Sequence, residues 1–117
     1  DICIAILNKK LSTLNINWKN RFSVSVVLTS NGYPGKFESG FEICGLENIN
    51  NNNTIVFHSG TKFKLGKFFT CSGRVLSVTS TADNIKSAIN NVYFDINNLY
   101  FENMYYRRDI ARMELEH

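Results

Sequence analysis

The stretch FHSGTKFKLGKFFTCSGRVL, residues 57–76, determines how the rest of the chain is organised. It begins as a strand that ends in His58-Ser59-Gly60-Thr61, and it closes where Gly73-Arg74 enters another strand. Lysines alternate with aromatic residues between these corners, which predicts a hairpin near Gly66 with one solvent-exposed face and one buried face. Small residues let a ligand approach the backbone, and a guanidinium offers a fork of donors to phosphate or carboxylate. We therefore predict one wall of an anion-binding cleft.

Several segments before this stretch have strand patterns. Alternation of apolar and polar residues predicts strands over 14–18 and 22–28, and the second should be central because Val27 makes its end apolar on both faces. Residues 41–46 and 54–58 are two more short strands, and the asparagine-rich loop between them is assigned no role. Residues 2–11 are apolar on most sides, which is typical of a helix that packs against another domain.

The loop Asn31-Gly32-Tyr33-Pro34-Gly35 is the sharpest turn that the sequence predicts. Pro34 is the only proline of the chain, and its ring fixes φ inside the turn. Two glycines and a proline around one tyrosine give more rigidity than a connection between strands requires. By itself the motif is a weak signal, and a plain connection is the alternative.

A strand over 74–81 leads into the clearest periodic element, a helix that Thr81 or Asp83 should cap. Its apolar side chains fall on one face that should close over the sheet, namely Ile85, Ala88, Ile89, Val92, Ile96 and Leu99. An edge strand at 100–101 and a terminal turn or short helix follow, where Asp109 caps the turn or pairs with an arginine. With about six to eight strands, the fold is α+β and mostly β, its sheet curled into a partial barrel or sandwich.

Composition excludes several classes of protein. The 117 residues form one domain, and the net charge of +3 is spread rather than gathered in one basic run. Cys3, Cys44 and Cys71 show no metal-ligand spacing, so we expect free, buried thiols in a reducing cytosol. There is no phosphate loop, nucleophilic triad or acidic cluster. What the residues offer is a recognition surface made of the glycine loop at 32–35, the corner at 58–61 and Arg74, with Arg107 and Arg108 as further candidates. A lone His58 is more often structural than ligand-binding.

The ends of the sequence also bear on its interpretation. It starts in the middle of an apparent helix without an initiator methionine, which indicates a piece of a longer protein. Residues 115–117, Leu-Glu-His, look like the remnant of a purification tag. The first apolar run is too short to cross a membrane.

Four motifs in this order resemble one known family. They are Gly32-Tyr33-Pro34-Gly35, Phe57-His58-Ser59-Gly60-Thr61, Gly73-Arg74-Val75-Leu76-Ser77-Val78 and Tyr106-Arg107-Arg108-Asp109-Ile110. Together they are similar to the C-terminal domain of the phosphoribosylamine–glycine ligases, or glycinamide ribonucleotide synthetases, of the ATP-grasp superfamily. The resemblance runs from about residue 2 to about residue 113. Each motif is weak alone, but four in register are specific.

The resemblance implies a barrel-sandwich-like antiparallel sheet of the rudimentary single-hybrid-motif type, covered by one helix, as in the C-terminal domain of biotin carboxylase. Residues 1–114 would form this domain, with 1–12 as the helix leading in from upstream domains. Such cytoplasmic enzymes join glycine to 5-phosphoribosylamine and hydrolyse ATP to ADP and phosphate in de novo purine (IMP) biosynthesis. ATP and Mg²⁺ (or Mn²⁺) are bound mainly by the upstream N-terminal and ATP-grasp domains, so the isolated domain should be inactive and hold no catalytic residue.

The same resemblance implies where the substrate binds. Gly73-Arg74 would hold the sugar 5′-phosphate, with Lys62 as a second cation. The full set of substrate-binding residues is Gly32, Tyr33, Pro34, Gly35, His58, Gly60, Thr61, Lys62, Gly73 and Arg74. Ser59 stands where the family usually has Ala, and Cys71-Ser72 stands where Asn-Gly is usual, so this chain departs from the family in the backbone of this corner but not at Arg74.

Two other interpretations stay open. One is a stand-alone β-barrel that binds protein, or nucleic acid through Lys62, Lys64, Lys67 and Phe68, since lysines beside aromatic residues can mark such a surface. The other is the C-terminal domain of a different ATP-grasp ligase or carboxylase, against which the first two motifs argue.

Overall fold

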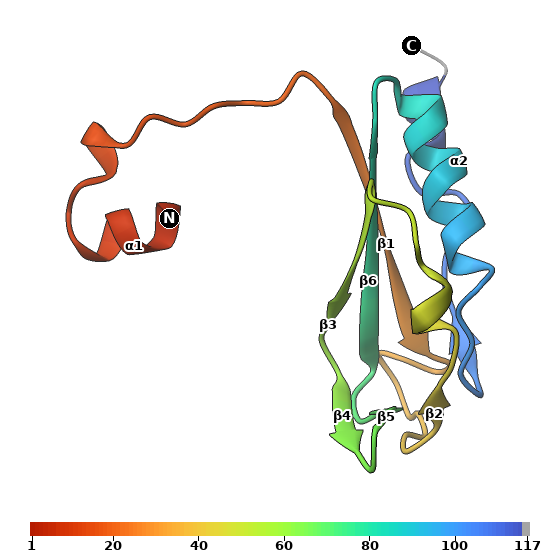
Figure 1. Cartoon of the computed structure of the whole chain (residues 1–117). Coiled ribbons are helices and arrows are strands. Elements are labelled where there is room, and N and C mark those ends of the chain that lie inside the picture. The colour runs from red at the N-terminus through yellow and green to blue at the C-terminus, as the bar shows by residue number, and fades with distance from the viewer. Residues whose placement is uncertain (116–117) are drawn as a thin grey trace.

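The computed structural model describes residues 1–115 of the chain and shows two antiparallel sheets, one long helix and an N-terminal arm (Figure 1). The four-stranded sheet has the order β3 (Thr54–His58), β6 (Arg74–Ala82), β1 (Phe22–Ser30) and β7 (Met104–Tyr105). The three-stranded sheet has the order β2 (Glu42–Ile43), β5 (Lys67–Thr70) and β4 (Thr61–Lys64). The predicted tag lies mostly on residues 116–117, outside the described part.

The mostly-β fold with one covering helix is confirmed, but the barrel is not. Within residues 1–115 the strands form two separate sheets, with β3 and β7 at the edges of one and β2 and β4 at the edges of the other. The β4–β5 hairpin, which turns at Gly66 as predicted, pairs with β2 instead of extending the larger sheet. Because β2 and β7 are only two residues long, neither edge is extended enough to close a barrel.

Helix α2 (Ile85–Ile96) packs on one face of the four-stranded sheet. Its predicted apolar stripe is confirmed, and Ala88, Val92 and Ile96 are completely buried. The cap is Asn84, whose side-chain oxygen accepts a hydrogen bond from the Ser87 amide at 2.8 Å. Thr81 and Asp83 were the wrong candidates, because β6 continues to Ala82 and leaves Asn84 as the first residue before the helix.

The core lies between α2 and the larger sheet. Alternate side chains of β1 and β6 point toward the helix and are buried, namely Val24, Val26, Leu28, Leu76 and Val78. Antiparallel pairing places Val26 opposite Val78 and Leu28 opposite Leu76, so both strands present one apolar row. Strand β1 lies between β6 and β7, which confirms that it is an inner strand.

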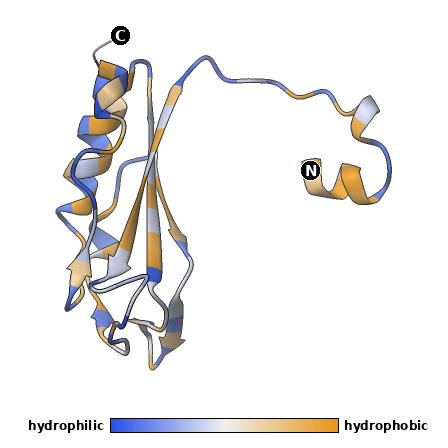
Figure 2. Ribbon diagram, turned by 180° about the vertical axis from the view of Figure 1, so that it is seen from behind, coloured by the Kyte–Doolittle hydropathy of each residue, from blue (hydrophilic) through white to orange (hydrophobic). Residues whose placement is uncertain are grey.

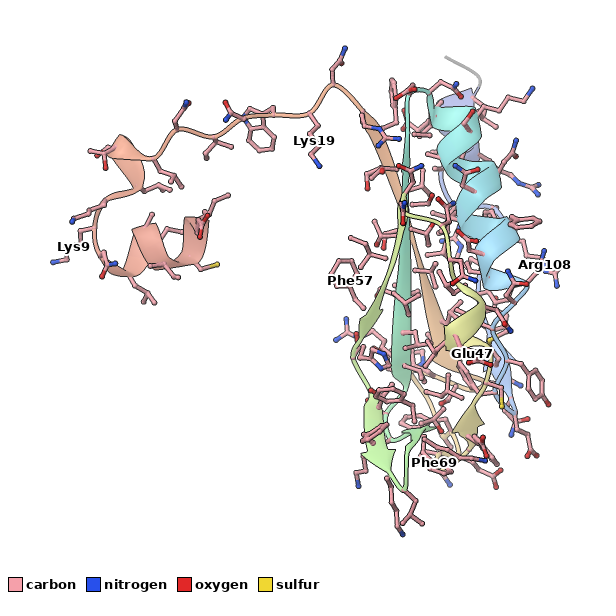
Figure 3. All side chains as sticks on the ribbon, viewed as in Figure 1. Lys9, Lys19, Glu47, Phe57, Phe69 and Arg108 are labelled. Atoms are coloured by element: carbon pink, nitrogen blue, oxygen red, sulfur yellow. The ribbon has the colours of Figure 1, made fainter. Side chains whose placement is uncertain are left out.

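The opposite face of the larger sheet, here called the open face, carries Ser25, Val27 and Thr29 of β1. Val27 is 40% exposed there, and Ile55 and Phe57 of β3 are 57% and 52% exposed. Figure 3 shows Phe57 pointing away from α2. Val27 is thus apolar on the face that α2 does not cover.

The predicted strand over residues 14–18 is wrong. These residues form an extended connection between η1 (Leu11–Thr13) and β1, and Trp18 is 86% exposed. Alternation of apolar and polar residues favours a strand only where a partner strand is available, and no described strand pairs with this segment. The predicted edge strand at 100–101 is also wrong, since Tyr100 forms only an isolated bridge with Cys44 and the edge strand is β7.

The N-terminal arm, residues 1–20, stands away from the body on the side of the sheet opposite α2 (Figure 1). Its helix α1 (Ile2–Leu7) is hydrophobic along its whole length (Figure 2), yet Ile4, Ile6 and Leu7 are exposed. No described helix is long and apolar enough to cross a membrane.

Two smaller expectations are settled by the described residues. All three cysteines are free, but Cys3 and Cys44 are exposed and only Cys71 is half-buried, so the first two are not core residues. The short terminal helix is η3 (Arg112–Leu115), and Asp109 pairs with Arg107 rather than capping it.

Candidate functional site

Two of the predicted bends meet through their backbones. The amides of Ser59 and Gly60 both donate to the Val75 carbonyl, at 3.0 and 3.1 Å. A Cβ on Gly60 would overlap the carbonyl oxygen of Arg74, so a side chain at this position would push the two bends apart. The small residue therefore allows the close approach that the sequence predicted, but the partner is β6 rather than a ligand.

The side chains of the two bends face different sides of the sheet. His58 pairs with Leu76, on the side that faces the core, and its ring packs on Phe68 with centroids 4.4 Å apart. Its Nδ1 also lies 2.9 Å from the Thr61 hydroxyl. Arg74 instead pairs with Thr29 on the open face. The register shift between Leu28 and Thr29 causes this difference, because a β-bulge redirects the side chains that follow it.

Arg74 lies in a groove of about 370 Å³ on the open face, here called the Arg74 groove. It is lined by two residues with hydroxyl groups, three tyrosines, two arginines and three apolar residues: Ser25, Thr29, Tyr33, Tyr105, Tyr106, Arg74, Arg107, Val26, Val27 and Ile110. The Val26 side chain itself is buried in the core. The Arg74 side chain makes no hydrogen bond or ion pair with any residue among 1–115. Its donors are therefore free to bind an anion.

Tyr33 is brought to this groove by Gly73. The Ser30 amide donates to the Gly73 carbonyl at 2.8 Å, which fixes the start of the Gly-Tyr-Pro-Gly loop beside the Gly-Arg corner. The Tyr33 ring lies directly on Gly73, in the space that a Cβ would occupy. Gly32 has φ +98° and lies against the Lys36 carbonyl, which makes glycine necessary for this turn. The loop and the corner thus form one structural unit.

Gly73→Ala is expected to lower the free energy of unfolding by about 1–3 kcal/mol, because the added methyl group overpacks the site against the Tyr33 ring. Urea unfolding of the single variant measures the loss. In a Tyr33→Ala background the ring is gone, and the same substitution should cost much less. An equal loss in both backgrounds would show that Tyr33 is not the residue in the way.

The remaining predicted cation, Lys62, lies elsewhere. It lines a separate groove of about 690 Å³ on the β4–β5 hairpin, together with Lys64, Phe63 and Leu65. On the same hairpin Lys67 forms an ion pair with Glu42 at 2.8 Å, and this hydrogen-bonded contact raises the pKa of Lys67. Lys62 and the His58–Thr61 pair therefore do not share a cavity with Arg74.

The groove also contains residues that were not among the predicted site residues. Tyr105, Tyr106, Arg107 and Ile110 come from the segment after β7. The sequence offers Arg107, with Arg108, as a further candidate for the recognition surface, and Tyr106 and Ile110 belong to the last motif of the resemblance. Nothing in the sequence singles out Tyr105 for the site.

The described residues do not form an obvious metal site. Among residues 1–115 no group of three or more His, Cys, Asp or Glu side chains gathers in a way that would hold a metal ion.

Comparison with known proteins identifies the family. Residues 23–113 match the family model described as phosphoribosylglycinamide synthetase, C domain. The chain is 41% identical, over 95% of its length, to the phosphoribosylamine–glycine ligase of Caldanaerobacter subterraneus, and 40% identical, over its whole length, to the bifunctional purine biosynthetic protein purD of Dictyostelium discoideum. It spans only 26% and 15% of these two relatives.

A solved structure agrees. The crystal structure of the phosphoribosylamine–glycine ligase from Thermotoga maritima superposes with a TM-score of 0.71 at 28% identity, covering 92% of this chain and 27% of that one. The sequence and the fold thus point to the same relatives. The chain belongs to the phosphoribosylglycinamide synthetase C-domain family.

Proposed function

We propose that this chain is the C-terminal domain of an enzyme that ligates glycine to 5-phosphoribosylamine with hydrolysis of ATP to ADP and phosphate, in cytoplasmic purine biosynthesis. Its part is to bind the 5′-phosphate of the sugar substrate in the Arg74 groove. The family match supports the reaction. The observation that carries the role of this domain is the unpaired Arg74 guanidinium, held beside Tyr33 in a groove on the open face.

The chemistry of the groove suits a sugar phosphate. A guanidinium donates two parallel hydrogen bonds to phosphate, while strand hydroxyls such as Ser25 and Thr29 suit the hydroxyls of a ribose. The tyrosines supply flat apolar surface around the sugar ring. In this proposal Gly73 and Tyr33 shape the groove, and Gly32, Pro34 and Gly35 hold Tyr33. Gly60 acts through the backbone of Arg74.

The domain contributes orientation rather than bond-making. In the reaction implied by the family, glycine is activated as an acyl phosphate and the amine of phosphoribosylamine attacks its carbonyl carbon. Binding the phosphate end of the sugar restricts the position of the amine relative to the acyl carbon. The attack then proceeds within one bound complex and does not depend on a chance collision of two molecules. The described residues gather no metal ligands, so we place ATP and its metal ion on the upstream domains.

The upstream domains are also the partner that we propose for the exposed apolar surface. The Caldanaerobacter relative is about four times as long as this chain, which covers 26% of it, and the Dictyostelium relative is longer still, with 15% covered. The arm carries exposed Ile4, Ile6 and Leu7, and the open face carries exposed Ile55 and Phe57. Exposed apolar side chains on both segments suit an interface with another domain.

Arg74→Ala in the full-length enzyme is the test. Loss of a charged hydrogen bond should weaken phosphoribosylamine binding by about 1.5–3 kcal/mol, which raises KM for that substrate by roughly 10- to 150-fold. KM for ATP and for glycine should change little, because only the sugar carries this phosphate. Lys62→Ala is the matched control, since Lys62 lies in the other groove. Unchanged kinetics toward phosphoribosylamine would remove Arg74 from the site.

A further inference from the structure

The Arg74 groove contains a second guanidinium. Arg107 lines it from the segment after β7, whereas Thr29 and Arg74 line it from β1 and β6. The neighbouring Arg108 does not: its guanidinium lies 5.6 Å from the centre of the Tyr106 ring, and it lines the groove beside α2. Figure 3 shows Arg108 on the α2 side of the molecule. Two adjacent arginines therefore serve different surfaces.

Arg107 is held in one orientation by Asp109. Its Nε and Nη2 atoms donate to the two carboxylate oxygens of Asp109, at 3.0 and 2.7 Å. This hydrogen-bonded pair lowers the pKa of Asp109 and raises that of Arg107, so both groups stay ionised at neutral pH. A guanidinium has five N–H donors, and two are used here. The Nη1 amino group and one N–H of Nη2 are free for a ligand.

The backbone of this segment is fixed to the core by Tyr93 of α2. The Tyr93 hydroxyl donates to the Arg107 carbonyl at 2.8 Å and accepts from the Ile110 amide at 3.1 Å. Tyr93 is anchored because its helix neighbours Val92 and Ile96 are completely buried. The Tyr93 hydroxyl thus attaches the turn that carries Arg107 to helix α2. Tyr93 itself does not line the Arg74 groove.

We propose that Arg107 is a second phosphate-binding residue of the Arg74 groove, and that Asp109 and Tyr93 are its positioning residues. The inference rests on the proposed function. Arg74 supplies a charge that no described carboxylate compensates, and Arg107 supplies oriented donors from a second segment that lines the same groove. A phosphate has three oxygens to satisfy, more than one guanidinium fork reaches, so donors from two segments suit it better than a single arginine.

The experiment uses the full-length enzyme and ribose 5-phosphate, a sugar phosphate without the reactive amine, as a competitive inhibitor against phosphoribosylamine. Arg107→Ala is expected to raise its inhibition constant by about tenfold or more, the scale of one charged hydrogen bond. Arg108→Ala, the neighbouring control, should change it by less than about twofold. Arg107→Lys keeps the charge but loses the fork, so it should bind more weakly than the native enzyme.

A purely structural role for Arg107 predicts a different pattern. It would change KM for ATP and glycine as well, whereas a phosphate-binding role leaves both near the native values. Tyr93→Phe removes only the hydroxyl, so the inhibition constant should rise while KM for ATP stays constant. If Arg107→Ala fails to fold, Arg107→Lys and Tyr93→Phe decide the question.

Two outcomes separate this inference from the proposed function. If Arg74→Ala weakens ribose 5-phosphate binding and neither Arg107 variant does, the second phosphate-binding residue is overturned and the function stands. If no arginine variant changes the inhibition constant, the phosphate does not bind in this groove and both proposals fail.

Discussion

Truncation of Phe101 to alanine is expected to lower the free energy of unfolding by about 3–5 kcal/mol, the cost of removing a buried aromatic ring from a close-packed core. Phe101 is 0% exposed and is the largest of the fully buried side chains. It follows α2 and belongs to the same hydrophobic cluster as Leu28, Val78 and Ile96. The loss is measured by equilibrium unfolding in urea, because the midpoint and slope together give the free energy.

Phe94→Ala is the matched control for this experiment. Phe94 lies on α2 but is 70% exposed, so its truncation should change the free energy of unfolding by no more than about 0.5 kcal/mol. Similar losses for the two phenylalanines would contradict the burial of Phe101.

The position of Phe101 also links the core to the Arg74 groove. The Phe101 carbonyl accepts a hydrogen bond from the Met104 amide at 3.1 Å. The carbonyl of Asn103, the residue before Met104, accepts a hydrogen bond from the Asn31 amide at 2.7 Å. The segment that Phe101 anchors therefore contacts the start of the Gly-Tyr-Pro-Gly loop before it delivers Tyr105 and Arg107 to the groove. A cavity at position 101 should loosen the groove as well as the core.

The helix and the inner strands were predictable because their patterns are local and their partners exist. The stripe from Ile85 to Ile96 indicates both the helix and the face that it buries, and only the cap was misplaced. Thr81, Asp83 and Asn84 are all good capping residues, so the sequence does not show which one ends the preceding strand.

The failures share one cause, which is that alternation does not show whether a partner is present. Residues 14–18 alternate as a strand should, but they lie in the arm, where no described strand pairs with them. Val27 is apolar on the open face, which α2 does not cover. In the same way, two short edge strands kept the sheets apart where a barrel was expected.

The site was only partly accessible from the residues themselves. That Gly60 and Arg74 lie close together follows from the two bends. That His58 and Arg74 face opposite sides depends on a bulge at Val75, which no residue type marks in the sequence. That Arg107 joins the groove depends on a contact between Tyr93 and the segment after β7, which only the folded chain shows.

Gly45→Ala is expected to lower the free energy of unfolding by about 2–5 kcal/mol. About 1–2 kcal/mol of this comes from placing an alanine in the left-handed backbone conformation, and the rest comes from lost hydrogen bonds. Gly45 has φ +87°, and a Cβ there would overlap the carbonyl oxygen of Asn98 just after α2. That carbonyl belongs to the backbone, so it cannot swing aside as a side chain does. Separation at this point would also break the mutual backbone hydrogen bonds of Cys44 and Tyr100, at 2.8 and 3.1 Å.

Gly40→Ala separates the two contributions. Gly40 has φ +99°, but a Cβ there would meet no atom within 4 Å, so this variant should lose only the strain of about 1–2 kcal/mol. Urea unfolding of both variants gives the difference, which measures the contact between Gly45 and Asn98. Equal losses would mean that the contact contributes nothing. A larger loss for Gly45→Ala would show that the contact between Gly45, next to β2, and Asn98, just after α2, holds the smaller sheet against the rest of the domain. These two residues lie 53 positions apart in the sequence.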